Sequence, residues 1–209
     1  MGFFRKKLSS NSLRERIIWT VVLFFVIFFG IMLISYYFLP EGLLKNKNPM
    51  QSWETSESIP LLTLQVFFYN LISVLVISLA SLFGNKKANE ANYFSVGYLA
   101  FFTLISINSI VLGTWSFSVE SEAVPLINRI TGTFDLAHRA GFWEMMGQLL
   151  VTCAIAHIAT IRSSGKETVT RRIKEIRLSN SEKAALLMGI IFILIGALVE
   201  SIAINTLGL

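Results

Sequence analysis

Two carboxylates lie within long apolar stretches of this sequence. Glu144 belongs to the stretch HRAGFWEMMGQLLVTCAIAHIA, which starts at residue 138, and Glu200 belongs to GALVESIAIN near the C-terminus. Ionisable side chains in such stretches are energetically costly and usually mark functional sites. Two carboxylates in one low-dielectric site could share a proton. Together with His138 they could also bind a divalent metal ion and activate a water molecule.

The spacing of these residues argues against the metal interpretation. His138 and Glu144 are six positions apart, so they do not share one face of a helix, and the chain has no HExxH motif. We therefore expect no cofactor, and a divalent metal at His138, Glu144 and Glu200 stays the alternative. The chain also has no Walker motif and no nucleophile elbow, so it cannot use ATP by itself.

Five apolar runs are long enough to carry such residues across a bilayer, at residues 17–38, 60–83, 93–115, about 141–161 and about 184–207. Each is close to the ~20 residues that a helix needs to cross a hydrocarbon core of about 30 Å. Only 15% of the chain is charged, against about 25% in soluble domains. The predicted fold class is therefore all-α: a polytopic transmembrane helical bundle of five spans.

The remaining segments complete the predicted organisation. Residues 1–16 form a cytoplasmic basic arm, and residues 17–209 form a single transmembrane helical domain. Residues 124–139 are moderately apolar and could add a sixth, re-entrant or interfacial helix.

Lysine and arginine residues predict the orientation of the bundle. Fourteen of the eighteen lie in residues 1–16, 84–92 and 162–183, and the other four lie in residues 39–59 and 116–139. The positive-inside rule then places the N-terminus in the cytoplasm and the C-terminus outside. Because these basic residues flank apolar runs, they indicate membrane topology and not nucleic-acid binding.

The five spans place polar side chains in the outer half of the bundle. At 1.5 Å per residue, Glu144 and Glu200 lie roughly 5–11 Å below the outer surface. Gly189, Gly196 and Ala203 form a small-residue stripe that predicts helix contact beside Glu200. We expect a pocket that opens outward and is lined by Asn70, Asn108, His138, Glu144, Gln148 and Glu200. A structural hydrogen-bond network, a transport or ligand pocket, and a hydrolytic site all remain open.

Residues 166–178 have a separate pattern. Val169, Ile173 and Ile176 recur at helical spacing with basic residues between them, which predicts a cytoplasmic amphipathic helix. This helix could lie on anionic lipid or dock a protein partner. The docking residues would be Arg171, Arg172, Ile173, Lys174 and Arg177. Ser179 and Glu182 match a capping box that would start the fifth span.

These residues resemble the stage II sporulation protein M family of bacterial multi-pass membrane proteins. The family's central motif is a His-Gly pair followed by a Glu, and AHRAGFWEMMGQLL supplies His138, Gly141 and Glu144. FFYNLISVLVISLASLFG is similar to the family's Asn-containing helix, with Asn70 at the Asn, and GALVESIAIN is similar to its terminal helix, with Glu200 at the acidic position. The resemblance covers roughly residues 60–209.

The resemblance implies a membrane partner within a larger assembly. One such family member works with peptidoglycan hydrolases during engulfment, and relatives sit beside ABC-type ATPases in systems that mature or export antimicrobial peptides, including circular bacteriocins. We therefore expect a multi-pass subunit of the bacterial cytoplasmic membrane, permease-like or scaffolding, for peptide export or maturation or envelope remodelling. Its expected partners are lipid, a protein such as a cytoplasmic ATPase, and a peptide substrate. The alternative is an intramembrane hydrolase or peptide cyclase that uses His138, Glu144 and Glu200.

Overall fold

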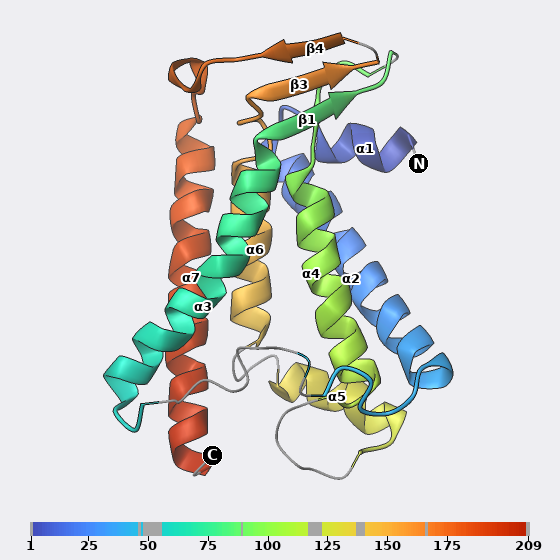
Figure 1. The fold of residues 1–209 in the computed structure, drawn as a ribbon, viewed down its shortest axis with the longest axis vertical. Helices are drawn as coiled ribbons and strands as arrows, with labels where there is room; N and C mark the ends of the chain where they lie inside the picture. The colour runs from blue at the N-terminus through green and yellow to red at the C-terminus, as the bar shows by residue number, and fades with distance from the viewer. Residues whose placement is uncertain are drawn as a thin grey trace.

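A computed structural model describes residues 2–45, 47, 56–88, 90–116, 123–136, 141–165 and 167–207, with the side chains of 132–136 and 206–207 left out. The chain is mostly helical and carries a small β-sheet at one end, which we call the sheet end (Figure 1). The N-terminus lies at the sheet end, and the C-terminus lies at the opposite end, which we call the far end.

Three helices in the described part of the chain are long and apolar enough to cross a membrane. They are α2 (Leu13–Phe38), α3 (Ile59–Ser81) and α7 (Asn180–Leu207). Large apolar side chains such as Val26, Phe68 and Leu187 are exposed on all three. An apolar surface of this extent is unusual for a protein that faces water on all sides, and it fits helices that face lipid.

The third and fourth predicted spans are shorter than expected. Helix α4 (Gly97–Gly113) has 17 residues, and helix α6 (Phe142–Ala154) has 13 residues, about 20 Å of helix. The prediction of a helix over residues 141–161 is therefore wrong at its C-terminal end, where the chain leaves the helix and enters strand β3 (Ile161–Ser164). Pairing of β3 with two other strands satisfies backbone groups that a longer α6 would satisfy internally.

The sheet corrects the all-α prediction. Its strand order is β2-β1-β3-β4, where β1 is Phe83–Lys86, β2 is Phe94–Ser95 and β4 is Glu167–Thr170. Strands β1 and β3 are parallel, with Phe83 opposite Ile161, and the two outer pairs are antiparallel. The connection between α3 and α4 and the connection between α6 and α7 are far apart in the sequence, and they form one sheet.

The predicted amphipathic helix over residues 166–178 is also wrong. This segment contains β4 and a short 3₁₀ helix, η3 (Ile173–Glu175). Gly165 has a positive φ of 63° at the turn between β3 and β4, a conformation that suits glycine. The β-branched run Thr168, Val169, Thr170 follows the turn and pairs with β3. Pairing with β3 therefore outweighs the helical spacing of the apolar residues in this segment.

The two ends of the bundle carry short helices. Helix α1 (Gly2–Leu8) and the first turn of α2 make up the predicted basic arm, and α1 contacts both α2 and β2. Helix α5 (Leu126–Leu136) lies at the far end (Figure 1), so a further helix is present within residues 124–139, and its re-entrant or interfacial placement stays a prediction. The capping box is confirmed as well, since Glu182 accepts a hydrogen bond from the Ser179 N–H at 2.9 Å.

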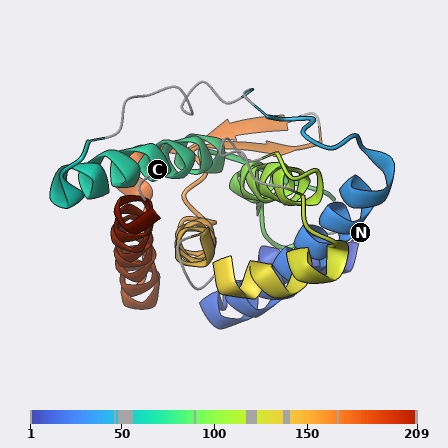
Figure 2. The same ribbon diagram turned by 90° about the horizontal axis from the view of Figure 1, so that it is seen from below.

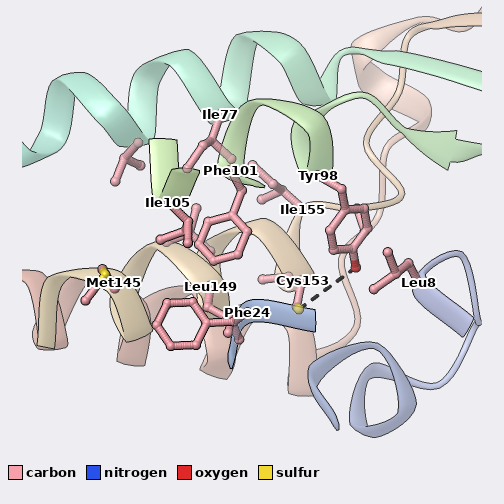
Figure 3. Close-up of a cluster of buried hydrophobic side chains, with 14 of the residues drawn as sticks. Leu8, Phe24, Ile77, Tyr98, Phe101, Ile105, Met145, Leu149, Cys153 and Ile155 are labelled. Carbon is pink, nitrogen blue, oxygen red and sulfur yellow. Dashed lines mark hydrogen bonds between the residues drawn. The ribbon is translucent and has the colours of Figure 1, made fainter. Parts of the chain in front are cut away.

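Helix α6 occupies the centre of the bundle. Viewed from below, α6 lies between α7 on the left and α2 on the right, and α3 and α4 lie above it in the picture (Figure 2). Helices α6 and α7 approach closely at Gly147 and Gly189: a Cβ on Gly147 would lie 2.6 Å from the Gly189 carbonyl oxygen. Apolar side chains fill the other contacts, among them Leu149, Phe101 and Phe24 (Figure 3).

Candidate functional site

The predicted polar face of α6 is present and hydrogen-bonded. The Gln148 side-chain Nε2 donates to Glu144 Oε1 at 2.7 Å, and the Thr152 hydroxyl donates to the Gln148 carbonyl at 2.7 Å. Gln148 is only 1% exposed. Its Oε1 atom is buried and has no hydrogen-bond partner. The face therefore presents an acceptor that nothing in the described structure satisfies.

Glu200 of α7 belongs to the same site. Its side chain is half-buried, as is that of Glu144, and the two carboxylates are close enough to interact electrostatically. This interaction brings the two carboxylates near each other, and their assignment to one pocket stays a prediction. Like charges repel in a low-dielectric interior, so the ionised pair is stable only if a proton, a cation or a donor lies nearby.

The depth of Glu144 differs from the prediction. Gly147, three residues away, contacts both Gly189 and Ile193 of α7. Because α6 and α7 are antiparallel (Figure 1), Glu144 lies beside the middle of α7 and not near its far end. The reason is that α6 begins at Phe142 and is short, so its first turn starts at mid-depth in the bundle.

Asn70 lies near this level, and Asn108 does not join the site. Asn70 is one helical turn from Val66, which packs against Ala197 of α7, and its buried Nδ2 atom has no partner. Asn108 is exposed on α4, so it is not part of the buried polar face of α6. His138 lies outside the described residues, and its assignment stays a prediction.

A second polar cluster, near the sheet end, is one that sequence reasoning missed. Arg16 of α2 is 0% exposed. Its Nη2 donates to Glu182 Oε1 of α7 at 2.5 Å, and its Nη1 donates to His157 Nδ1 at 2.8 Å. His157 is therefore neutral, and its Nε2–H is left to donate to the Ser9 carbonyl at 3.4 Å. A buried ion pair thus connects the first and last long helices beside the end of α6.

The sequence alone shows this cluster only weakly. In the sequence, Arg16 is one of several basic residues that indicate membrane orientation, and Glu182 is part of a capping box. Arg16 is more than a hundred positions from both His157 and Glu182, so these polar groups meet only in the folded chain.

A third contact fastens α1 to the sheet. The Arg5 guanidinium donates to both oxygens of Glu90, at 2.7 and 2.8 Å, and to Asn85 Oδ1 at 2.8 Å. It also lies over the Phe94 ring, 4.6 Å from the centroid. Hydrogen bonding to Arg5 holds the pKa of Glu90 at about 2, far below its usual value. Bidentate pairs of this kind fix orientation as well as charge.

The predicted docking residues divide into two groups. Arg171 is half-buried; its Nη2 donates to the His157 carbonyl at 2.8 Å, so it stabilises the fold. The others are exposed: Arg172, Ile173, Lys174 and Arg177. Strand β4 beside them is an edge of the sheet, all four of its residues are exposed, and Val169 is 56% exposed.

The site contains no recognisable metal centre in the described ranges, where no three His, Cys, Asp or Glu side chains are grouped to hold an ion. Fold and site together define a mostly helical chain with membrane-length helices, an internal polar cluster and a small sheet at one end. No protein-family model, no curated protein and no solved structure matches the chain.

Proposed function

We propose that this chain is an integral, multi-pass subunit of the bacterial cytoplasmic membrane that works within a multi-protein system. In this proposal the chain crosses the bilayer five times, with α2, α3, α4 and α7 in four of the crossings and the short helix α6 forming the sheet-end part of the other; α2, α4 and α7 run away from the sheet end, and α3 and α6 run toward it (Figure 1). The three basic segments that hold fourteen of the eighteen Lys and Arg residues all belong to the sheet end. The positive-inside rule then places the sheet and the N-terminus in the cytoplasm.

The observation that carries the proposal is the open edge of β4. The Arg171 N–H donates to the Thr160 carbonyl at 2.7 Å, and Val169 is paired with Arg162. In an antiparallel pair, the N–H groups of alternate residues face the neighbouring strand. The N–H groups of Thr168 and Thr170 therefore point outward, away from β3. Such an edge is a template for an added strand.

The surroundings of this edge indicate what would bind. Exposed Arg172, Lys174 and Arg177 follow β4, and Ile173 is 77% exposed between them. An extended acidic segment with an apolar residue would satisfy the strand edge, the charges and the apolar surface together. We assign this segment to a cytoplasmic partner of the subunit, for which an ATPase is the leading candidate.

The polar cluster inside the bundle supports a permease-like role over a purely structural one. Buried acceptors without partners destabilise a fold, so a cluster of this kind is better explained by binding than by packing. The substrate class, a peptide or an envelope component, follows from the resemblance to the stage II sporulation protein M family. This part of the proposal depends on that resemblance.

Thr168→Pro tests the proposal because it removes one outward N–H, and proline is tolerated on edge strands. Thr168→Ala is the matched control, since it keeps the N–H and removes only the side chain. Both variants and the wild type would be purified from native membranes in mild detergent and analysed by quantitative mass spectrometry. We expect one partner protein to copurify in near-equal amounts with the wild type and with Thr168→Ala. This protein should be lost from the Thr168→Pro sample.

Vesicle flotation separates a protein partner from a lipid surface. Equal recovery of every protein in the Thr168→Pro and wild-type samples would contradict docking at β4. Loss of binding to anionic vesicles, with all proteins retained, would show instead that this surface contacts lipid headgroups.

A further inference from the structure

We propose that Glu144, Gln148 and Glu200 form a binding site for a small monovalent cation inside the helical bundle. This inference goes beyond the proposed docking function and does not depend on the β4 edge.

The first support is the unsatisfied acceptor. Gln148 is 1% exposed, and its Nε2 donates to Glu144 Oε1. With Glu144 ionised, the opposite amide orientation would place two oxygens against each other. Oε1 of Gln148 is therefore a buried acceptor without a partner, which is destabilising unless a cation or a donor binds it.

The second support is charge. Glu144 and Glu200 interact electrostatically, and two ionised carboxylates in a low-dielectric interior repel each other unless one is protonated or a positive charge lies between or beside them. One bound cation would relieve this repulsion and satisfy the Gln148 oxygen at once.

The donor set favours a monovalent ion over a divalent one. Calcium takes six to eight oxygen ligands, and magnesium takes a near-ideal octahedron. The described residues contain no group of three acidic, His or Cys side chains. Burial favours the protonated form of one carboxyl, and the single negative charge that remains matches a monovalent ion such as sodium, or a proton that the two carboxylates share.

The position of the site agrees with this chemistry. Coupling ions in transporters bind near the bilayer midplane, where a helix is interrupted. Helix α6 starts at Phe142 beside the middle of α7, and Glu144 lies in its first turn. The helix N-terminus by itself disfavours a cation, but it stabilises an ionised Glu144. The acceptors lie along the side of α6, away from its axis.

The test measures the thermal unfolding midpoint of the purified full chain in detergent against sodium chloride. Choline chloride keeps the ionic strength constant. A ligand that binds only the folded state raises the midpoint with its concentration. For the wild type we expect a saturable rise with sodium, or with falling pH in sodium-free buffer if the ion is a proton.

Two variants assign the effect to the site, and each is compared with itself in choline so that altered stability does not confuse the result. Glu144→Gln removes a charge with little change of shape, and Gln148→Met removes the amide oxygen at similar volume. We expect apparent affinity at least about tenfold weaker in both. The exposed Asn108→Leu is the control and should respond like the wild type.

Two results would overturn the inference. One is a wild-type midpoint that is independent of both sodium and pH between 5 and 8. The other is an ion response that Glu144→Gln and Gln148→Met both leave unchanged. Neither result bears on partner docking at β4, so the two proposals fail separately.

Discussion

Arg16 and Glu182 are joined by an ion pair of 2.5 Å across 166 positions of sequence, and both side chains are buried. The pair joins α2 to α7 near the sheet end, where His157 and Ser10 accept further hydrogen bonds from the same guanidinium. A buried charge is tolerated only when it is paired and hydrogen-bonded. The arrangement therefore fixes how the two outermost long helices approach each other on either side of α6 (Figure 2).

Removing one member of this pair should be costly. Arg16→Met leaves Glu182 buried without its partner, so we expect a loss of about 3–5 kcal/mol in unfolding free energy. Arg14→Met, at an exposed position of the same helix, should change stability by less than about 0.5 kcal/mol. Chemical unfolding in mixed micelles measures both. Equal stabilities of the two variants would show that the buried pair does not hold the helices.

The contact between α6 and α7 predicts a strong effect of one methyl group. In Gly147→Ala the new Cβ would lie 2.6 Å from the Gly189 carbonyl and from the Ile193 side chain. Backbone atoms cannot yield as a flexible side chain can, so the helices must separate, at a cost of about 1–3 kcal/mol.

Gly30→Ala is the matched control for this substitution, because nothing lies within 4 Å of its new Cβ. Alanine is the better helix former by about 1 kcal/mol, so Gly30→Ala should be neutral or stabilising. Thermal unfolding followed by intrinsic fluorescence compares the two. A Gly147→Ala midpoint equal to that of Gly30→Ala would rule out close packing at this crossing.

The single cysteine should report global unfolding. Cys153 is 0% exposed; its thiol donates to the Thr20 hydroxyl at 3.3 Å and accepts from Tyr98 at 3.9 Å (Figure 3). Buried thiols in such surroundings are unreactive. A maleimide should therefore label less than about a tenth of the folded protein in an hour, and all of it in denaturant. Rapid labelling in the folded state would contradict the burial.

The contact between Arg5 and Glu90 should weaken only in acid. Because Arg5 lowers the pKa of Glu90 to about 2 in the folded chain, from a reference of 4.5, the contact stabilises the fold fully above about pH 5. Its contribution should fall as the pH drops from 4.5 toward 2. Amide hydrogen exchange in α1, corrected for intrinsic rates, measures the effect.

Glu90→Gln should loosen α1 at pH 7, and exchange there should be several-fold faster than in the wild type. Glu167→Gln, at an exposed position on β4, is the control and should leave α1 unchanged. Exchange in α1 that is the same for wild type and Glu90→Gln would show that α1 is held by its apolar contacts alone.

Much of the fold could be predicted because it follows from local patterns. Apolar length identifies α2, α3 and α7, and the capping box identifies the start of α7 within a few residues. The helical face of Glu144, Gln148 and Thr152 also follows from spacing alone. Each of these features depends on residues that are close in the sequence and belong to one helix.

The sheet and the buried ion pair could not be predicted in the same way. Strands β1 and β3 are four residues each and become strands only because Phe83 meets Ile161. Neither segment has the length or alternation that marks an isolated strand. The helical spacing of Val169, Ile173 and Ile176 is local evidence, and pairing across the chain outweighs it.

The sequence by itself determined the apolar helices, the side of the bundle on which basic residues gather, and the presence of two carboxylates within it. Only the tertiary structure decided that α6 is short, that Glu144 lies beside the middle of α7, and that Arg16 meets Glu182. The physical reason is the separation in sequence between the residues that determine each feature. Hydropathy and capping act over a few residues, whereas depth, strand pairing and buried ion pairs depend on how distant segments pack.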